Sequence, residues 1–406
     1  MTTPPAGRRV PDRPGLRIVI VGAGIGGLTA ALTLAAGGHD VTLVERATGF
    51  SAIGAGLQLS PNASRVLIDL GLGASLRRMA GEPERVRIRS LGGREIGGVA
   101  LGETMRERFG APYWVIHRAD LQTVLLDAVR GRPGIRLLVG RTATALGETA
   151  DEASVTIETA GGRGEVLTAD LVVCADGVRS ALRPRLDRRP LKPLGAAAWR
   201  ATLPRAEAPD GFSANETGLW LGRDRHVVHY PIRGGERINL VAVMPQAPGE
   251  TDWSASGDPE RIRAAFADAA APLRALIAAP EDWLAWTLAD RAAARPMARG
   301  RIALLGDAAH PVLPFLAQGA ALAIEDAADL AARLAADPVP KALARYAAVR
   351  AARAGRVQSH ARRNGRLYHS GRLVAAARDA VMARLGPEGM TARYAWLYGW
   401  RPESHS

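Results

Sequence analysis

The feature of the sequence that most constrains its fold is an uncharged run near the beginning of the chain. Residues 18–38 read IVIVGAGIGGLTAALTLAAGG, and Gly22, Gly24, Gly26 and Gly27 fall within six residues. The run is long enough to span a membrane, but glycines this closely spaced suit a turn better than a helix in lipid. The strand-like sequence VTLVE follows where a signal peptide would be cleaved. We therefore expect neither a membrane span nor a signal peptide.

The run and its neighbours predict one βαβ unit. The pattern indicates a strand over Arg17–Val21, a glycine turn, a helix over Gly26–Gly37 and a strand over Asp40–Glu45. The preceding 15 residues, which contain four prolines, are expected to form a disordered leader. A strand, glycine turn and helix in this order are typical of a Rossmann-like domain that binds a dinucleotide.

The glycines of the turn form the pattern GxGxxG through Gly22, Gly24 and Gly27. They allow a tight turn and a close approach of the backbone to a pyrophosphate, to which the helix start offers unpaired N–H groups. Glu45 can accept a hydrogen bond from a ribose 2′-hydroxyl and would repel a 2′-phosphate. A glycine turn without a ligand is the alternative, and this fingerprint alone does not separate FAD from NAD.

The rest of the pattern indicates mixed α/β structure without internal repeats. Helices are expected at residues 62–80, 117–130 and 258–279, from Arg179-Ser180, and from Gly319 to about residue 385. Strands are expected within residues 85–101 and 135–173 and at Leu194–Ala201, Gly218–Leu221, His226–Ile232, Arg237–Met244 and Ile302–Leu305. The middle strands are separated by turn signals such as RGGE at 233–236, and they predict a largely antiparallel sheet. The chain therefore leaves an α/β domain for this sheet and returns at Ile302.

Composition excludes several classes of function. The 406 residues suit two or three domains around a sizeable core. Cys174 is the only cysteine, which rules out a disulfide framework and favours a reducing, cytoplasmic compartment. The net charge of +13 is carried by arginines, with Lys192 and Lys341 the only lysines. No zinc-finger spacing, recognition helix or metal-ligand cluster accompanies it, so we expect anionic small molecules rather than nucleic acid or metal.

Two later segments place polar residues directly after a buried strand. DLVVCADGVRSALR, at residues 170–183, runs from a strand into Asp176-Gly177. RIALLGDAAHPVLPFLAQGAALAIEDA, at residues 301–327, runs from a strand into Gly306-Asp307, two prolines and a helix that starts near Gly319. With the first glycine turn, the chain therefore carries GxGxxG, Asp-Gly and GDAAHP in this order.

These three motifs, their order and the intervening sheet resemble the FAD-dependent aromatic hydroxylases, which are single-component flavin monooxygenases of the p-hydroxybenzoate hydroxylase fold. The resemblance covers nearly the whole chain. HPVLPFLAQGAALAIEDA and WLYGW are most similar to the salicylate, 3-hydroxybenzoate and 6-hydroxynicotinate hydroxylase branch. The resemblance implies an α/β fold, with a Rossmann-like FAD-binding domain, an inserted mixed, mainly antiparallel substrate-binding sheet and C-terminal helices.

The resemblance also implies a reaction. NAD(P)H would reduce FAD, O2 would give a flavin C4a-hydroperoxide, and this oxidant would hydroxylate a small phenolic or carboxylated aromatic substrate. Such a ring reacts faster as a phenolate, so a base near its hydroxyl helps, and a water-poor site protects the oxidant. Two alternatives stay open: a same-fold monooxygenase or epoxidase acting on a larger non-benzoate substrate, and a non-catalytic FAD-binding sensor.

The cofactor-binding residues follow from the same resemblance. Asp307 is expected to hydrogen-bond the ribityl chain of FAD. Gly319 and Ala320 are expected to direct their N–H groups at the pyrimidine edge of the flavin, where the reduced ring carries negative charge. Arg118 matches an arginine that contacts FAD, and Asp176 matches the Asp-Gly motif; a surface arginine and a helix N-cap are the alternatives. The other expected cofactor-binding residues are Gly22, Gly24, Gly27, Glu45 and Arg46.

The segment RHVVHYPI, at residues 225–232, supplies candidates for the substrate site. On a strand, His226 and Tyr230 share one face and His229 faces the other. H-x-x-x-Y-P resembles the hydroxybenzoate and hydroxynicotinate branch, in which both side chains line the substrate site. We therefore expect His226 to be the catalytic base or orienting partner and Tyr230 to hydrogen-bond the substrate. Two half-buried strand residues with satisfied hydrogen bonds are the alternative, and His229 is expected to be structural or solvent-facing.

The segment after GDAAHP is expected to complete the substrate pocket with Pro314, Phe315 and Gln318. His310 is expected to pack beside the flavin and shape the loop rather than act as the base. Hydroxynicotinate-like members have a polar pair before AQG, where this chain has Leu313-Pro314-Phe315. This apolar wall argues against a pyridine substrate.

The expected domains are discontinuous because the chain leaves its first domain and returns to it. The FAD-binding domain is expected at 1–82, 108–187 and 286–345, the substrate-binding sheet at 83–107 and 188–285, and a helical segment at 346–406. The expected partners are a small aromatic substrate, O2 and NAD(P)H, and the protein is expected to be a monomer or homodimer.

Overall fold

A computed structural model describes residues 15–50, 55–212, 215–246 and 255–403. The leader expected for the first 15 residues lies outside the described residues except for Gly15. No helix in these ranges is long and apolar enough to cross a membrane.

The predicted βαβ unit forms the centre of a six-stranded sheet. β1 (Arg17–Val21) pairs in parallel with β2 (Asp40–Glu45), and α1 (Ile25–Ala36) connects them. β11 (Leu171–Cys174) pairs in parallel with the other side of β1, and β19 (Ile302–Leu304) pairs in parallel with β11. The prediction that the chain returns to its first sheet after residue 300 is therefore confirmed.

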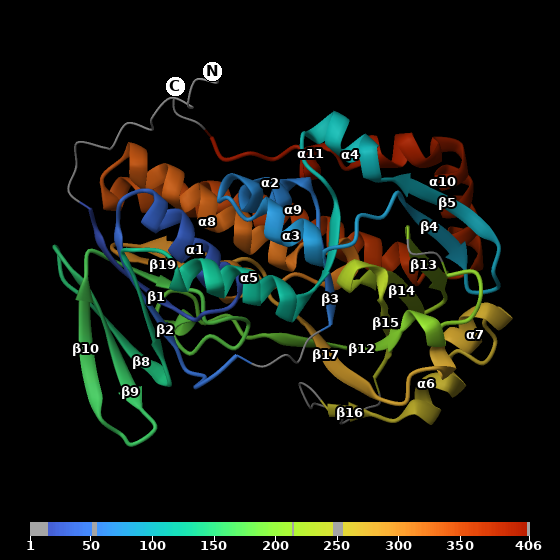
Figure 1. Cartoon of the computed structure of the whole chain (residues 1–406), viewed down its shortest axis with the longest axis horizontal. Helices are drawn as coiled ribbons and strands as arrows, with labels where there is room; N and C mark the ends of the chain where they lie inside the picture. The colour runs from blue at the N-terminus through green and yellow to red at the C-terminus, as the bar shows by residue number, and fades with distance from the viewer. Residues whose placement is uncertain (1–14, 51–54, 213–214, 247–254, 404–406) are drawn as a thin grey trace.

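The core of this sheet explains why its strands read as apolar runs. Every side chain of β11 and β19 is buried, as expected for parallel strands covered on both faces. α1 packs against α5 (Arg118–Arg130) and α8 (Gly319–Ala336), which lie beside it in Figure 1. The sheet order is β18-β19-β11-β1-β2-β7, completed by β18 (Ala298–Arg299) and β7 (Ile135–Val139).

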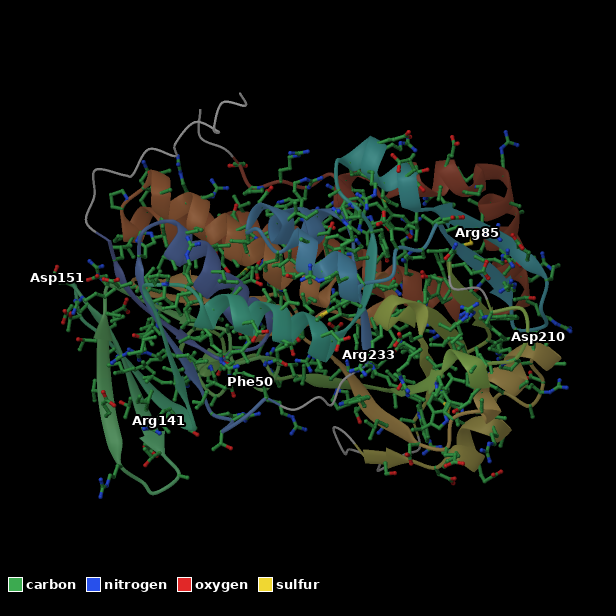
Figure 2. The ribbon with its side chains drawn as sticks, viewed as in Figure 1. Phe50, Arg85, Arg141, Asp151, Asp210 and Arg233 are labelled. Carbon is green, nitrogen blue, oxygen red and sulfur yellow. The ribbon has the colours of Figure 1, made fainter. Side chains whose placement is uncertain are left out.

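A second, mainly antiparallel sheet has eight strands in the order β16-β17-β12-β15-β14-β13-β4-β5. The two strands at one edge of this sheet, β4 and β5, precede residue 101 in the chain. β4 joins them to the other strands by pairing with β13. Figure 2 shows Arg85 at this end of the molecule, away from Arg141 and Asp151. The strands are β4 (Arg85–Ser90), β5 (Glu95–Ala100), β12 (Lys192–Pro204), β13 (Glu216–Gly222), β14 (Arg225–Ile232), β15 (Arg237–Pro245), β16 (Ala255–Gly257) and β17 (Trp283–Asp290).

Smaller elements fill the space around the two sheets. One three-stranded sheet and one two-stranded sheet are present. Their strands are β8 (Arg141–Glu148), β9 (Ala153–Thr159) and β10 (Gly164–Ala169), and β3 (Gly56–Leu59) and β6 (Trp114–His117). The helices not yet named are α2 (Pro61–Asp69), α3 (Gly73–Met79), α4 (Gly102–Phe109), α6 (Pro259–Ala265), α7 (Ala271–Ala278), α9 (Val339–Tyr368), α10 (Arg372–Arg393) and α11 (Ala395–Tyr398).

Three predicted helices differ from the structure. The helix expected at 62–80 is two helices, α2 and α3, because Gly71 between them has a φ of 84°, outside the helical region. The helix expected at 258–279 is likewise split into α6 and α7. No helix begins at Arg179; the chain turns there and forms one 3₁₀ turn at Arg183–Arg185.

The predicted fold class is confirmed: an α/β Rossmann-like part, a mixed sheet and C-terminal helices are all present. The domain boundaries stay a prediction. The pairing of β4 with β13 supports the expectation that 83–107 joins the second sheet.

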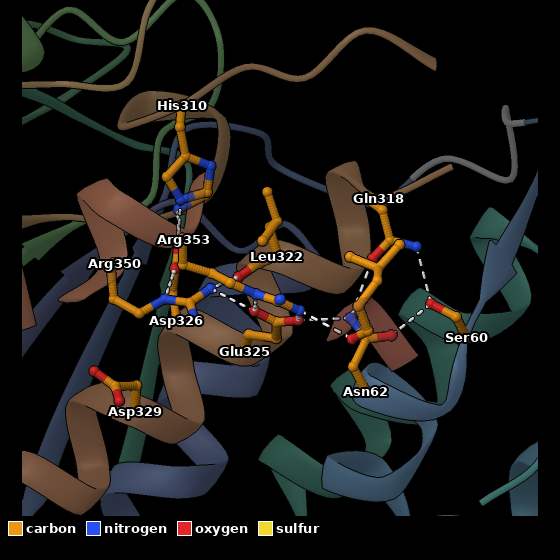
Figure 3. Close-up of polar contacts among 12 residues, drawn as sticks. Ser60, Asn62, His310, Gln318, Leu322, Glu325, Asp326, Asp329, Arg350 and Arg353 are labelled. Atoms are coloured by element: carbon orange, nitrogen blue, oxygen red, sulfur yellow. Dashed lines mark hydrogen bonds and ion pairs between the residues drawn. The ribbon is translucent and has the colours of Figure 1, made fainter. Parts of the chain in front are cut away.

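A buried ionic network joins α8 to α9. Arg350 of α9 donates to Glu325 at 2.8 Å and to Asp326 at 2.7 Å, and all three side chains are fully buried. Arg353 also donates to Glu325, at 2.8 Å. Figure 3 shows these side chains converging between the two helices. Because buried charges are costly unless they are paired, each member depends on the others.

Replacing Arg350 with Met is expected to lower the free energy of unfolding by about 3–5 kcal/mol, because it removes the buried cation that Glu325 and Asp326 share. Arg345→Met is the matched control on the same helix, since Arg345 is itself exposed and its partner Asp337 keeps a second cation in Lys341. This exchange should cost less than about 1 kcal/mol. Denaturant unfolding followed by circular dichroism measures both changes. Equal losses in the two variants would contradict the central role of the network.

Candidate active site

The first glycine turn is shaped by close packing on one side and open space on the other. Gly22 has a φ of 101°, and a Cβ there would lie 2.5 Å from the carbonyl oxygen of Ala175. A Cβ on Gly27 would lie 1.8 Å from the carbonyl oxygen of Gly22. A Cβ on Gly24, in contrast, would meet no heavy atom of the protein within 4 Å. The turn therefore packs closely against the end of β11 and leaves the backbone at Gly24 unobstructed. A backbone site for phosphate requires such open space.

Two helix N-termini remain available to a ligand. Neither α1 nor α8 has a side-chain hydrogen bond at its N-cap, and neither has an acidic residue in its first turn. Gly319 begins α8, and its nearest Cβ contact would be Asp307 Oδ1 at 4.0 Å. Gly319 and Ala320 are both half-buried. Free N–H groups at a helix start favour negative charge on a bound group.

Asp307 occupies an unusual environment. Its side chain is exposed, whereas Gly306, Ala308, Ala309 and His310 around it are all buried. Although the side chain reaches solvent, the protein around it partly desolvates the carboxylate and raises the pKa of Asp307, and the positive charges nearby oppose this rise. An exposed carboxylate inside a shell of buried residues suits hydrogen bonding to a ligand rather than to the protein.

Other charged residues from distant segments gather around Asp307. Arg118, at the start of α5, and Arg291 are close enough to lower its pKa by attraction. Asp176 also interacts electrostatically with Arg291. Burial raises the pKa of Asp176, against hydrogen bonds from the hydroxyl of Ser180 and from neighbouring N–H groups. Electrostatic interactions thus connect Asp307 with Arg118 and, through Arg291, with Asp176. The contacts of these residues with the cofactor stay predictions.

The arrangement fits FAD. Open backbone at Gly24 and the start of α1 suit the pyrophosphate, the exposed carboxylate of Asp307 can accept hydrogen bonds from the ribityl hydroxyls, and the start of α8 suits the electron-rich flavin edge. Glu45 already accepts hydrogen bonds from the N–H groups of Ala23 and Ala47, at 2.7 and 2.9 Å. The predicted contacts of Glu45 and the exposed Arg46 with the cofactor stay predictions.

His226 and Tyr230 lie on the second sheet with the predicted alternation. Both are buried on β14, and His229 points to the opposite face against Phe212, with ring centroids 4.9 Å apart. Burial, with a smaller effect from His369, lowers the pKa of His226 to about 3. Burial also raises the pKa of Tyr230 above its usual range. Both side chains are therefore neutral at physiological pH.

An aromatic cluster surrounds His226. Its Nδ1 lies 2.8 Å from Nε2 of His369, and its ring centroid is 5.5 Å from that of Phe315 and 5.6 Å from that of Tyr368. Leu313 and Phe315 pack against apolar residues of the sheet, so the loop after GDAAHP covers this part of β14. The predicted apolar wall is thus placed directly beside His226. The sequence reasoning missed Tyr368 and His369, which lie at the end of α9 without any motif.

Tyr230 packs against β3. Gly56 donates its N–H to Asn239 at 2.6 Å, and a Cβ on Gly56 would lie 2.5 Å from the ring of Tyr230. Asn239 lies opposite Tyr230 in the register of β14 and β15. The close approach explains why a glycine is needed at this point, and it fixes the position of the tyrosine ring.

Two candidate residues are held inside the protein. The buried carboxamide of Gln318 donates to Ser60 at 2.9 Å and accepts from Asn62 at 3.1 Å, so its predicted place in the substrate site stays a prediction. His310 is buried and lies 2.7 Å from Asp326, which agrees with a loop-shaping role. Pro314 is half-buried at the start of a 3₁₀ turn.

Exchange of Asp307 for Ala is expected to weaken FAD binding by about 10- to 100-fold, the worth of a hydrogen bond to a charged group. Asp210→Ala is the control, because Asp210 is exposed and lies at the far end of the second sheet in Figure 2. Flavin release during gel filtration and titration of apoprotein with FAD measure the effect. Undiminished FAD affinity would contradict the assignment of Asp307.

The lowered pKa of His226 predicts a pH dependence of stability. Its folded pKa of about 3 lies below its unfolded value of about 6.5, so only the unfolded state takes up the proton between these values. Stability is therefore unaffected above pH 6.5 and falls by about 1.4 kcal/mol per pH unit, for this one group, as the pH drops toward 3. His226→Asn should flatten the decline between pH 6.5 and 5, measured as unfolding free energy. Parallel curves for variant and wild type would exclude this contribution.

The comparisons with known proteins agree with this geometry. A family model described as an FAD binding domain matches residues 16–361. 3-Hydroxybenzoate 6-hydroxylase of Polaromonas naphthalenivorans (strain CJ2) is 35% identical over 393 residues, covering 96% of this chain and 97% of that protein. 3-Amino-4-hydroxybenzoate 2-monooxygenase PtmB3 of Streptomyces platensis is 37% identical over 398 residues, covering 96% of each.

A solved structure shows the same fold with a cofactor bound. Klebsiella pneumoniae HpxO, complexed with FAD and uric acid, superposes with a TM-score of 0.81 and 27% identity. The match covers 94% of this chain and 96% of that chain. The likeness therefore extends over both sheets and the C-terminal helices.

Proposed function

The chain belongs to the FAD-binding-domain family of flavin-dependent aromatic hydroxylases, and from this we propose that it hydroxylates a small phenolic or carboxylated aromatic compound with NAD(P)H and O2. The names of the relatives above support a hydroxybenzoate-type substrate. Bound FAD supplies the redox chemistry, and the residues of the chain bind and orient the ring, exclude water and handle its hydroxyl proton.

The observation that carries the proposal is the neutral His226 in an apolar aromatic shell. His226 lies beside Phe315, in the loop that follows Asp307, so a ring bound against it lies close to the predicted flavin position. The buried apolar residues Leu313, Val243 and Ala198 pack with Phe315. Such a wall excludes water, and it suits an aromatic ring better than a polar or charged chain.

His226 is suited to handle the proton of a phenolic hydroxyl. In the tautomer that donates its Nδ1–H to His369, His226 carries the free lone pair on Nε2. No hydrogen bond from the described part of the chain reaches that atom. A neutral imidazole can therefore accept a hydrogen bond from the substrate. A phenolate formed beside it would favour the imidazolium by charge pairing, so its pKa would rise from about 3 when substrate is bound.

Tyr230 has the complementary role. Its raised pKa keeps the phenol protonated, so the hydroxyl donates or accepts hydrogen bonds without carrying charge. The ring is held by Gly56 and Asn239, which fixes the direction of that hydroxyl. We propose that Tyr230 orients the substrate and that His226 exchanges the proton.

Hydroxybenzoates are expected to accelerate NAD(P)H oxidation severalfold and to perturb the flavin absorbance near 450 nm. His226→Ala should retain FAD but convert most of the NAD(P)H consumed into hydrogen peroxide instead of hydroxylated product, because the substrate hydroxyl loses its partner. Peroxide and product are quantified against NAD(P)H in the same reaction.

His229→Gln is the control, since His229 lies on the opposite face of the same strand. Unchanged coupling in His226→Ala would remove His226 from the proton step. A protein that binds FAD but responds to no small aromatic compound would contradict the proposed substrate class and favour a larger substrate or a sensor.

A further inference from the structure

His369 contacts the proposed proton acceptor, although no sequence motif contains it. It is the C-cap residue of α9, and its Nε2 lies 2.8 Å from Nδ1 of His226. His226 is buried, whereas His369 is half-buried and reaches solvent. One imidazole inside the aromatic shell is therefore joined to a second imidazole at the edge of the protein.

Two neutral imidazoles that share one hydrogen bond have two possible arrangements. Burial lowers the pKa of both His226 and His369, so both rings are neutral at physiological pH, and each carries one N–H and one lone pair. If His226 donates its Nδ1–H, its Nε2 keeps a lone pair for the substrate hydroxyl. If His369 donates instead, Nε2 of His226 carries the hydrogen and cannot accept a proton. The choice between the two arrangements decides whether His226 can act as a base.

Packing fixes which nitrogen of His226 meets His369. The ring of His226 has its centroid 5.5 Å from that of Phe315 and 5.6 Å from that of Tyr368. The ring of His369 stands nearly perpendicular to the same Phe315, at 5.7 Å and 88°. These contacts hold Nδ1 of His226 toward His369 and leave Nε2 on another side of the ring. They do not decide which of the two nitrogens carries the hydrogen.

Asp224 is a charged group that acts on His369. Burial lowers the pKa of His369, and the carboxylate of Asp224 opposes this shift. Asp224 lies in the turn between β13 and β14, and its N–H donates to the carbonyl oxygen of His369 at 3.3 Å. Its contact with Arg223, at 3.5 Å between two exposed side chains, is weakened by water. The turn therefore places a negative charge beside the outer of the two imidazoles.

A negative charge beside His369 favours one of the two arrangements. Because Nε2 of His369 is engaged with His226, Nδ1 is the nitrogen left for solvent. A nearby carboxylate stabilises an N–H there and disfavours a lone pair. A neutral His369 with its hydrogen on Nδ1 has its lone pair on Nε2, where it accepts the Nδ1–H of His226. The charge of Asp224 thus acts on Nε2 of His226 through two neutral rings.

We propose that His369 is the positioning residue of the proton step: with the charge of Asp224 next to it, it holds His226 in the tautomer whose lone pair lies on Nε2. This inference rests on the proposed function and adds the residues that prepare its base. When the O–H bond of a phenolic substrate breaks, the proton forms an N–H bond at Nε2 and the electron pair stays on the phenolate oxygen. The Nδ1–H bond to His369 persists, and the proton returns to the hydroxylated product as it leaves.

Nitrogen-15 NMR of the FAD-loaded enzyme, labelled at histidine, reads the tautomer without turnover, because an N–H nitrogen and a lone-pair nitrogen differ in chemical shift. His226→Gln identifies the resonances. The wild type without substrate is expected to carry the hydrogen on Nδ1 of His226. Hydrogen on Nε2 would overturn the inference. An enzyme that shows the expected tautomer but hydroxylates no aromatic compound would contradict the proposed function instead.

Two exchanges at His369 separate positioning from packing. An ionised Glu only accepts hydrogen bonds, so His369→Glu should keep the hydrogen on Nδ1 of His226 and most of the coupling of NAD(P)H oxidation to product. Arg only donates, so His369→Arg should move the hydrogen to Nε2 and lower the rate of coupled hydroxylation about 10-fold or more. The FAD content of each variant is measured alongside. The same tautomer in both variants, or equal loss of coupling, would contradict the inference.

Asp224→Asn tests the source of the preference. Asn tolerates the φ of 61° at this position and keeps the N–H that donates to His369. The exchange should give a mixture of His226 tautomers and lower coupling about 2- to 3-fold, the effect of one exposed charge. Asp268→Asn is the matched control, because Asp268 is also exposed but pairs with Arg225, and it should change neither. An unchanged tautomer in Asp224→Asn would overturn the part assigned to Asp224.

Discussion

The cofactor side of the molecule depends on the buried carboxylate of Asp326. It accepts hydrogen bonds from the N–H of Gly306 at 2.9 Å and from Arg350 at 2.7 Å, and it lies 2.7 Å from His310. Burial opposes its ionisation, but His310 and Arg350 outweigh burial and lower its pKa to about 2. One charged group thus fixes both ends of the GDAAHP turn, and the turn in turn holds Asp307. A buried anion with this many partners leaves the loop no second arrangement of similar energy.

The same network explains why the start of α8 is free to bind a ligand. Gln318 stands at the N-cap of α8, but its carboxamide is turned to Ser60 and Asn62, and Asn62 also donates to Glu325 at 2.6 Å. Figure 3 shows this chain of contacts leading from Gln318 to Arg350. Because the side chain that could cap the helix is used elsewhere, its first N–H groups keep their donor capacity. The polar interior therefore preserves an electrostatic feature that a flavin edge can use.

Local patterns in the sequence predicted the parts of the structure that local chemistry determines. Alternation placed His226 and Tyr230 on one face of β14 and His229 on the other, and apolar runs identified β1, β11 and β19. The break at Gly71 was missed, because a lone glycine inside a helical pattern does not reveal its own φ. The partners of the site residues could not be predicted either. His369 reaches His226 only because the end of α9 packs against the sheet, and no spacing in the sequence encodes that contact.

The placement of charged side chains likewise depends on packing, which composition does not reveal. A net charge of +13 suggested a preference for anions without placing it. In the structure, most arginines of the second sheet have acceptors nearby, so their N–H groups are paired within the fold. The unmatched cation at Arg200 lies on the sheet face of the neutral His226, whereas the exposed anion Asp307 lies on the cofactor side. Packing therefore decides which charges stay available to a ligand, which the net charge of the chain cannot show.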